Sequence, residues 1–179
     1  MKVSKEQVAK HRAQIVAAAG RLFRQRGFDG VSVADIMKEA GLTHGAFYGY
    51  FTSKEALMAE AVAQALAPAS KYLPAEQYAD NYLSTRHRDN RADGCMFAGL
   101  GSEAVRGSDD LRHAMTEALR RQIDRFAAES KGRTEKERRR AAVATWSSMV
   151  GAVLLARLVD DESLSKEILA GTRASLSFD

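Results

Sequence analysis

The side chains with the clearest chemical use lie in one short segment, residues 43–54, which contains one His, two Tyr and one Lys among hydroxyl residues. Hydroxyl and ammonium groups donate hydrogen bonds to phosphate oxygens, and imidazole and small apolar groups can contact base edges. No nucleophile–base pair, carboxylate pair or zinc-type Cys/His spacing is readable elsewhere in the chain. The segment therefore indicates nucleic-acid recognition rather than catalysis.

Two short helices are expected to position these groups, within the sequence VADIMKEAGLTHGAFYGYF at residues 33–51. Ser32 with Asp35 resembles a capping box, and the apolar residues that follow repeat at helical spacing. Gly41 is placed to end the first helix in a left-handed conformation, and Thr43 to cap the second from about His44. This is the pattern of a helix-turn-helix whose second helix enters the major groove of DNA.

An earlier helix is predicted from Ser4 to near Gly27, with an apolar stripe that would cover the other two. The result is a three-helix N-terminal unit. Gly45 and Gly49 would each cost an isolated helix about 1 kcal/mol relative to Ala. Close approach of the helix to DNA is the benefit expected in return.

These residues together resemble the TetR/AcrR family of bacterial transcriptional regulators over about the first 65 residues. The resemblance rests on several positions in one register: Ile15 to Phe23, Gly27-Phe28, Asp35-Ile36, Ala40-Gly41, Phe47-Tyr48, Tyr50-Phe51 and Ser53-Lys54-Glu55-Ala56-Leu57. It implies a DNA-binding N-terminal domain and a divergent helical ligand domain. It also implies dimerisation through the last two helices.

The resemblance further implies which residues meet DNA. Thr43, Tyr48, Tyr50 and Lys54 match phosphate contacts, whereas His44, Gly45, Ala46 and Phe47 match positions that face bases. Gly49 departs from the polar residue that the family often has there. With Ser32, these eight residues are the predicted DNA-binding set. Packing in the core is the alternative for Phe47 and for both tyrosines.

Composition agrees with a helical DNA-binding protein. Residues 1–60 hold nine Lys or Arg against six Asp or Glu, so most of the net charge of +4 falls on the predicted DNA-binding part. The single Cys excludes an intramolecular disulfide, and no cofactor is expected. Residues 1–10 do not resemble a signal peptide. The uncharged stretch 141–156 is shorter than the roughly 20 residues that span a bilayer. We therefore expect a cytoplasmic protein without a membrane partner.

An all-α fold of about nine helices is predicted. Residues 1–53 form the helix-turn-helix domain, residues 54–67 a connecting helix, and residues 68–179 a ligand-binding and dimerisation domain. Residues 68–74, between two prolines, are the expected hinge or linker. Further helices are expected at about 75–86, 94–106, 109–130, 135–158 and 162–177.

The helix at 135–158 is apolar nearly all round, which favours burial on several sides. Together with the last helix it could form a four-helix interface between two subunits. The predicted interface residues are Trp146, Val150, Gly151, Leu154, Ile168, Thr172 and Leu176. The alternative is that both helices pack inside a monomer.

The middle of the chain offers residues for a ligand cavity, each of which could equally be plain core. They are Tyr78, Tyr82, Met96, Phe97, Leu100, Met115, Leu119, Ile123 and Phe126. Cys95 is expected at a helix N-terminus beside Arg88 and Arg91, which would lower the thiol pKa and favour a redox or electrophile sensor. A small buried residue is the alternative for Cys95.

The sequence thus predicts a homodimeric regulator, most simply a repressor, that binds a palindromic double-stranded DNA operator. A small hydrophobic inducer, or modification of Cys95, would release it through the helix that begins at Lys54. Two other classes stay open. One is a non-specific DNA-binding protein, and the other is an enzyme or carrier in the helical C-terminal domain.

Overall fold

The computed structural model describes residues 4–67 and 73–178, and this part of the chain contains helices and no strand. The all-α prediction is confirmed. In order, the elements are α1 (Lys5–Arg26), α2 (Val33–Glu39), the 3-10 helix η1 (His44–Gly49), α3 (Lys54–Ala65), α4 (Ala75–Tyr82), α5 (Thr85–Asp89), α6 (Met96–Ala104), α7 (Asp109–Ala128), α8 (Glu135–Leu158) and α9 (Glu162–Ser175). The predicted hinge at 68–74 lies mostly outside the described residues.

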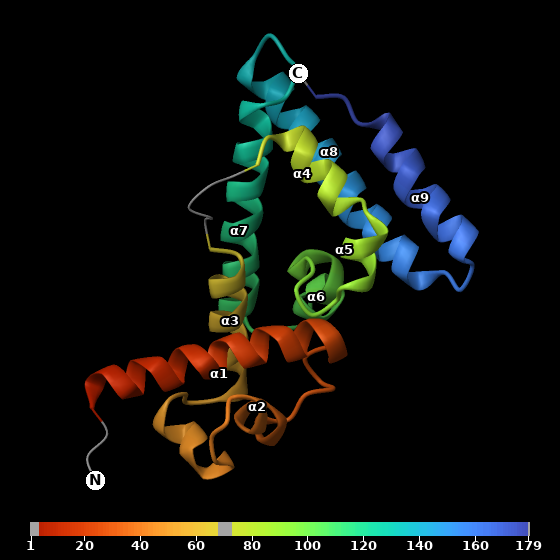
Figure 1. Ribbon diagram of the computed structural model, residues 1–179. Helices are drawn as coiled ribbons and strands as arrows, with labels where there is room; N and C mark the ends of the chain where they lie inside the picture. Colours follow the sequence, from red (N-terminus) through yellow and green to blue (C-terminus); the bar gives the residue numbers. More distant parts are fainter. Residues whose placement is uncertain (1–3, 68–72, 179) are drawn as a thin grey trace.

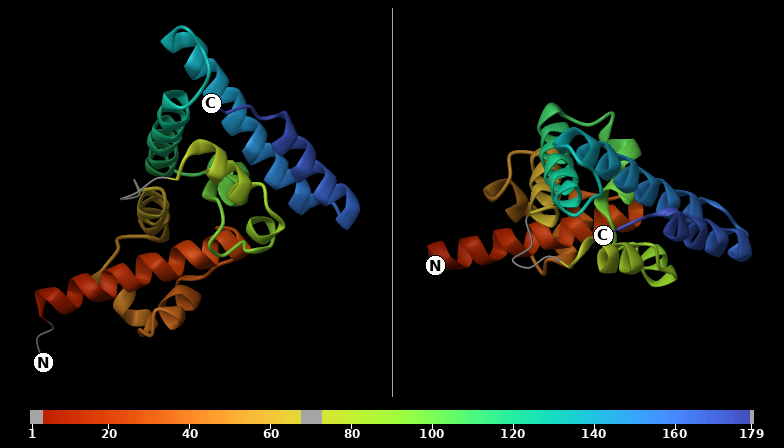
Figure 2. Two further views of the ribbon diagram at one scale, coloured as in Figure 1. Left: turned by 45° about the horizontal axis from the view of Figure 1, so that its top comes forward. Right: turned by 90° about the horizontal axis from the view of Figure 1, so that it is seen from above.

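The helices form two parts that meet along α1 (Figure 1). Beneath α1 lie α2 and η1, which with α1 make up the N-terminal unit. Above it, α3 and α7 run side by side, and α8 and α9 form an antiparallel pair along one outer edge (Figures 1 and 2). The short helices α4, α5 and α6 lie between these two pairs.

Side-chain caps fix most of the helix N-termini. Ser4, Ser32, Ser53, Ser84, Ser108, Thr134 and Asp161 each accept a backbone hydrogen bond at a helix N-terminus. Ser32–Asp35 is a complete capping box, as predicted, and Thr134–Glu137 is a second one. The helix predicted at 75–86 is divided instead, because Ser84 accepts from the His87 N–H and starts α5.

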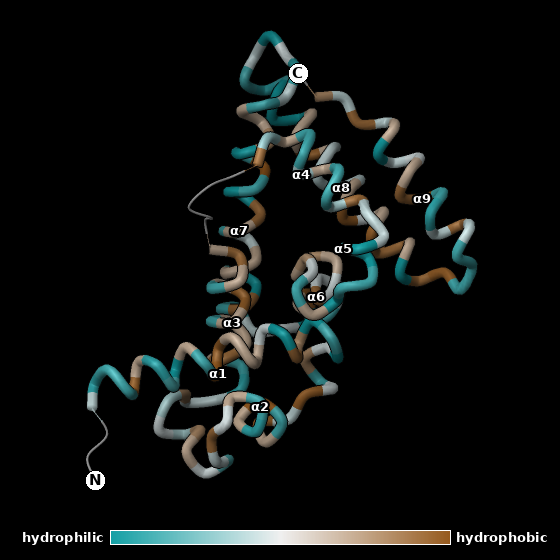
Figure 3. Tube along the Cα trace, in the orientation of Figure 1, coloured by the Kyte–Doolittle hydropathy of each residue, from teal (hydrophilic) through white to brown (hydrophobic). Residues whose placement is uncertain are grey.

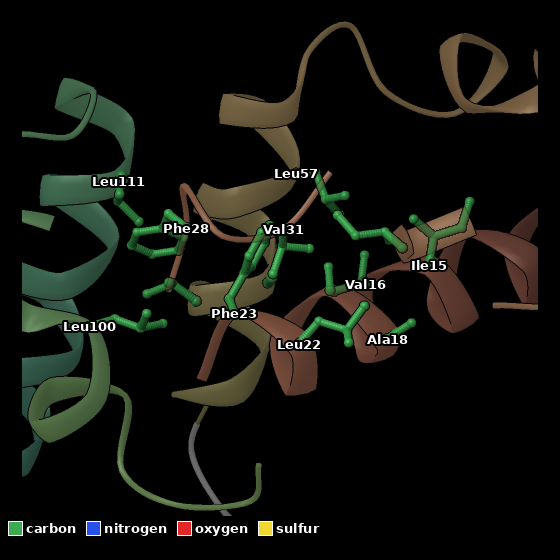
Figure 4. Close-up of a cluster of buried hydrophobic side chains, with 14 of the residues drawn as sticks. Ile15, Val16, Ala18, Leu22, Phe23, Phe28, Val31, Leu57, Leu100 and Leu111 are labelled. Atoms are coloured by element: carbon green, nitrogen blue, oxygen red, sulfur yellow. The ribbon is translucent and has the colours of Figure 1, made fainter. Parts of the chain in front are cut away.

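Two hydrophobic clusters hold the parts together. The first joins the N-terminal unit to α3 and to the facing ends of α6 and α7, through residues such as Phe23, Phe28, Leu57, Leu100 and Leu111 (Figure 4). The second joins α4, α6, α7, α8 and α9. α6 contributes to both clusters, because Met96, Leu100 and Ala104 belong to the first and Ala98 belongs to the second, so α6 packs against the N-terminal unit as well as against α8.

α8 is 24 residues long and, by length and composition alone, apolar enough to cross a membrane. Core helices of soluble proteins have the same character. Here α8 packs against α7 and α9; its first turns are hydrophilic and most of its remaining length is apolar (Figure 3). Four of its large apolar side chains stay exposed: Val143, Leu154, Leu155 and Leu158.

Candidate DNA-binding surface and ligand cavity

The turn between α2 and η1 is built by local hydrogen bonds. Gly41 has φ of +71° and lies after the end of α2, where the sequence predicted a left-handed residue. The Leu42 N–H donates to the Met37 carbonyl (2.8 Å) and closes the turn. Its side chain packs against the first hydrophobic cluster. The turn thereby sets the direction in which η1 leaves α2.

η1 differs from the predicted second helix in two respects. It is a 3-10 helix, and Thr43 makes no side-chain hydrogen bond at its N-terminus. Glycines at positions 45 and 49 weaken α-helix propensity, and without a cap the short segment keeps the tighter form. A Cβ added at either glycine would meet nothing within 4 Å, so this surface is open to a partner.

The base-facing prediction is wrong for Phe47. Its side chain is fully buried, stacks on Phe51 and belongs to the first cluster. His44 and Gly45 are exposed on the same segment, and Ala46 is half-buried. The exposed part of η1 therefore consists of His44, Gly45, Tyr48 and Gly49.

The predicted phosphate contacts have different surroundings. Thr43 is exposed, and Tyr48 is 71% exposed, with its ring edge-on to Phe47. The Tyr50 hydroxyl hydrogen-bonds to His11 Nδ1 (2.9 Å), and Lys54 Nζ donates to the Phe28 carbonyl (2.6 Å). The Ser32 hydroxyl donates to Asp35 within the capping box. Tyr48 is thus the most accessible aromatic of the set.

A cavity of about 640 Å³ lies in the other part of the molecule, between α3, α4, α6, α7 and α8. Its aromatic wall consists of Tyr78, Tyr82, Phe97 and Trp146. The rings are in mutual contact, with centroid separations of 5.3 Å for Tyr82–Trp146 and 5.8 Å for Tyr78–Tyr82. These side chains give the cavity a rigid apolar surface.

The predicted ligand residues divide into two groups. Tyr78, Tyr82, Met96 and Phe97 line the cavity. Leu100 and Met115 do not; both are buried in the first hydrophobic cluster. Phe126 is buried in the second cluster, against which Leu119 and Ile123 pack. The apolar spacing marked these positions as buried but did not indicate which cluster each would join.

Sequence reasoning missed the polar lining. Arg24 from α1 and Arg121, Gln122 and Arg125 from α7 border the cavity, together with His87 and Asp93. Arg24 Nε donates to the Ala92 carbonyl, so the N-terminal unit contributes directly to the cavity wall. Burial lowers the pKa of Arg24, and nearby Asp93 opposes that effect. The only sequence feature that could have indicated Arg24 is the basic last turn of α1, which contains Arg24 and Arg26.

Cys95 lines the cavity, but the expected low thiol pKa is wrong. Burial raises the pKa of Cys95, although the Tyr82 hydroxyl and backbone N–H groups of α6 act in the opposite direction. Of the two arginines invoked, Arg88 is engaged by Asp89 and Glu162, and the cation acting on the thiol is Arg157. Desolvation therefore outweighs the favourable charges.

The neutral imidazole of His87 joins two elements at the end of the cavity near Cys95. The Cys95 N–H donates to His87 Nε2 (3.1 Å), so the ring proton is on Nδ1, which donates to the Tyr82 carbonyl (2.7 Å). Burial lowers the pKa of His87, which favours the same neutral form. The imidazole thus holds the start of α6 against the end of α4.

The outer face of α8 and α9 carries exposed apolar side chains. They include Leu154 (40% exposed), Leu158 (73%) and Leu164 (41%). A Cβ added at Gly151 or Gly171 would meet nothing within 4 Å, so both helices can be approached closely. Of the predicted interface residues, Val150, Ile168 and Leu176 are partly buried against the second cluster. Thr172 on α9 is half-buried.

Trp146 does not belong to this face. It is only 4% exposed and contacts the rings of Tyr78, Tyr82, Phe97 and Phe126 within its own subunit. The apolar character of α8 on all sides concealed which side chains face inwards. The predicted interface is corrected at this position.

An N-terminal helix-turn-helix unit joined to a helical body is an architecture of DNA-binding transcriptional regulators. Residues 15–61 match the family model described as bacterial regulatory proteins, tetR family. Over these residues the chain is similar to the DNA-binding part of TetR-family regulators.

Sequence relatives are similar mainly in the same region. The regulator TtgR of Pseudomonas putida is 44% identical over 55 residues, which cover 31% of this chain and 26% of TtgR. The transcriptional repressor NemR of Escherichia coli is 28% identical over 122 residues, 61% of each chain. Over the first curated relatives, the matches span only 15–30% of the relative's length.

Solved structures extend the similarity of fold to almost the whole chain. Reduced E. coli NemR has a TM-score of 0.69 at 23% identity and covers 94% of this chain and 97% of its own. A TetR-family regulator from Agrobacterium tumefaciens has a TM-score of 0.73 at 19% identity, with coverage of 95% and 99%. At these identities the likeness concerns the fold alone.

Proposed function

We propose that the protein is a dimeric transcriptional repressor that binds a palindromic DNA operator and is released by a small molecule bound in the cavity. The observation that carries the proposal is the tetR-family match over residues 15–61, which includes the exposed segment around Tyr48. Such a protein acts where chromosomal DNA is, in the cytoplasm.

Dimerisation is part of the proposal because one three-helix unit makes few phosphate contacts. The exposed apolar side chains of α8 and α9 support pairing of two copies through these helices. Two recognition segments related by a twofold axis would then read two matched half-sites. The spacing between the half-sites is set by how the two bodies are oriented.

Release by a ligand requires that the ligand bind one conformation better than the other. Contacts between the cavity and the N-terminal unit support such coupling: Arg24 borders the cavity from α1, and α6 packs against both hydrophobic clusters. α3, the connection predicted from the sequence, packs against both α1 and α7. A coupling free energy of about 2–3 kcal/mol would give useful induction.

Covalent modification of Cys95 is the second signal that the sequence suggested. Cys95 lines the cavity, but the pKa of its thiol is raised, so little thiolate is present at neutral pH. We therefore propose non-covalent binding as the principal signal.

Selection of bound sequences from a random duplex pool, at near-physiological salt, tests the function. A shared palindrome is expected. Enrichment without sequence preference would contradict the proposal and favour a non-specific DNA-binding protein, whose affinity depends mainly on salt.

A matched pair of histidine variants localises the DNA contact. His44→Ala removes an exposed side chain of η1, whereas His113→Ala removes an exposed side chain of α7 outside the N-terminal unit. We expect His44→Ala to weaken operator binding about tenfold, in keeping with the loss of a base or phosphate contact of ~1–3 kcal/mol. His113→Ala should bind like the wild type. Equal affinity of the two variants would contradict the assignment of η1 as the recognition segment.

A further inference from the structure

The cavity has a positively charged lining, which restricts the charge that its ligand can carry. This inference rests on the proposed function. Three arginines border it, Arg24, Arg121 and Arg125, whereas Asp93 is its one acidic lining residue among the described residues. His87 adds no charge because its two ring nitrogens are engaged in the neutral form. A cationic ligand would therefore meet net repulsion, and an anionic ligand net attraction.

Two of these arginines come from different elements and have backbone partners. Arg24 Nε donates to the Ala92 carbonyl, and an Arg121 terminal nitrogen donates to the Leu66 carbonyl (3.1 Å). Within residues 4–67 and 73–178, neither is ion-paired with a carboxylate. A guanidinium has five N–H donors, so each retains several for a ligand.

Buried hydrogen-bonding groups at the cavity point to the same chemistry. The Gln122 amide nitrogen and the Tyr82 hydroxyl are buried and line the cavity, and neither makes a hydrogen bond of normal geometry in the described part of the chain, although the Tyr82 hydroxyl lies near the Cys95 thiol. The amide nitrogen can only donate, and the hydroxyl can donate as well as accept. A buried donor without an acceptor costs about 1–3 kcal/mol, so an acceptor-rich ligand would gain by satisfying these groups.

The remaining wall selects the body of the ligand. Tyr78, Tyr82, Phe97 and Trp146 present ring faces and edges within one contiguous cluster. Arg125 lies over the Tyr78 ring at 4.4 Å, so the cationic and aromatic surfaces adjoin. Planar rings pack well against such a wall. The volume of about 640 Å³ accommodates a compound of one to three fused rings.

We propose that the cavity binds an aromatic carboxylate, with its rings against Tyr78, Tyr82, Phe97 and Trp146 and its carboxylate towards Arg121, Arg125 and Gln122. A carboxylate accepts about four hydrogen bonds and pairs in bidentate fashion with a guanidinium. It would also attract Arg24, the cavity-lining cation that comes from α1. Competition for Arg24 between the ligand and the Ala92 carbonyl links occupancy of the cavity to the N-terminal unit.

Calorimetric titration of the full-length protein with three probes of one shape tests the charge preference. The probes are 2-naphthoate, the neutral 2-naphthamide and the cationic 2-naphthylmethylammonium. We expect 2-naphthoate to bind at least 10-fold more tightly than 2-naphthamide, and the ammonium compound to bind most weakly. Equal binding of the carboxylate and the amide, or no binding of the carboxylate, would overturn the proposal.

Variants of α7 locate the carboxylate. Arg121→Gln removes a cation from the cavity, and Gln122→Glu replaces a donor by an acceptor of the same size. Each should reduce the affinity for 2-naphthoate at least 10-fold and leave that for 2-naphthamide within about threefold. Arg120→Gln is the matched control, since Arg120 is exposed, pairs with Glu117 and is not among the cavity residues. An unchanged preference in both cavity variants would also overturn the proposal.

Operator release is measured separately, so that the two proposals fail independently. Binding of 2-naphthoate without release of operator DNA would retain the ligand class and contradict its role as inducer. Release by 2-naphthamide but not by 2-naphthoate would retain the regulatory function and overturn the ligand class.

Discussion

The Glu103 carboxylate on α6 accepts a hydrogen bond from the backbone N–H of Phe28 (2.6 Å), in the turn that follows α1. Glu103 lies near the C-terminal end of α6. The N-terminal end of α6 follows Cys95, and Cys95, Met96 and Phe97 line the cavity. One helix of nine residues thus connects the cavity wall with the N-terminal unit. A shift of α6 on ligand binding would act directly on the turn that positions α2.

Glu103→Gln should weaken the coupling between the cavity and DNA. The amide can still accept from Phe28, but without the charge the hydrogen bond loses about 1 kcal/mol. We expect the ratio of operator affinities without and with inducer to fall about fivefold, while inducer affinity measured without DNA stays unchanged. Fluorescence anisotropy with a labelled operator measures the ratio.

Glu135→Gln is the control for this prediction, since Glu135 is an exposed residue in the first turn of α8. It should keep the wild-type ratio. A wild-type ratio in Glu103→Gln as well would show that coupling follows another contact, such as the packing of α3 against α7.

Substitution of two glycines in the N-terminal unit compares the stability lost through backbone strain with the stability lost when a side chain also displaces Glu103. Gly27 has φ of +78° and Gly41 φ of +71°, both in the region that favours glycine. A Cβ at Gly27 would lie 2.7 Å from a Glu103 carboxylate oxygen, whereas one at Gly41 would meet nothing within 4 Å. Gly41→Ala should cost about 1–2 kcal/mol of stability from strain alone. Gly27→Ala should cost at least about 1 kcal/mol more, because its ψ of 169° lies in a region that only glycine readily adopts and because the displaced carboxylate loses its hydrogen bond to Phe28.

Chemical denaturation of the two variants measures the difference. Equal losses of free energy of unfolding would show that Glu103 moves aside at no cost. In that case the contact between α6 and the α1–α2 turn could not transmit a ligand-induced shift.

The local features of the N-terminal unit could be predicted because they depend on neighbouring residues. The Ser32–Asp35 capping box and the left-handed Gly41 require only a few residues of sequence. Phe47 was harder to place, because periodicity does not distinguish a buried ring from one that faces a groove. Its burial depends on Phe51 and α1, which meet it only after the chain has folded.

The cavity could be predicted only in part, for a related reason. Its aromatic residues are apolar and recur at helical spacing, so burial was evident. Its cations were not, because Arg24, Arg121 and Arg125 are typical of solvent-exposed helix faces and converge only through the packing of α1 and α7 around α6. The predicted low pKa of the Cys95 thiol was wrong for a similar reason. The position of Cys95 at a helix N-terminus can be read from neighbouring residues, whereas its desolvation depends on all the elements that pack around it.

The reactivity of Cys95 should reflect its raised pKa. A thiol whose pKa is raised is neutral at pH 7 and gains thiolate only as the pH rises through that pKa. The rate of alkylation by iodoacetamide should therefore increase up to and beyond pH 9, with no plateau below it. Tyr82→Phe removes a hydroxyl that favours the thiolate, so it should slow the reaction further at every pH below the pKa.

A plateau of the alkylation rate below pH 8 would contradict this prediction. It would show that the thiolate is stabilised at neutral pH, and modification of Cys95 would then become the stronger signal. Cys95→Ser serves as the blank, because the chain contains no other cysteine.

The outer face of α8 and α9 should carry the subunit interface. Leu158 on α8 and Val105 after α6 are both 73% exposed, so they form a matched pair in different places. In a dimer formed by α8 and α9, Leu158→Glu would bring two unpaired carboxylates into an apolar contact, which costs several kcal/mol. We expect the dissociation constant of the dimer, measured by sedimentation equilibrium, to rise by a factor of about 100 or more, which corresponds to ~2.7 kcal/mol. Val105→Glu should leave the dimer unchanged, since it lies outside this face. Weaker association in Val105→Glu than in Leu158→Glu would place the interface at the α6–α7 end, and the two recognition segments would then need a different half-site spacing.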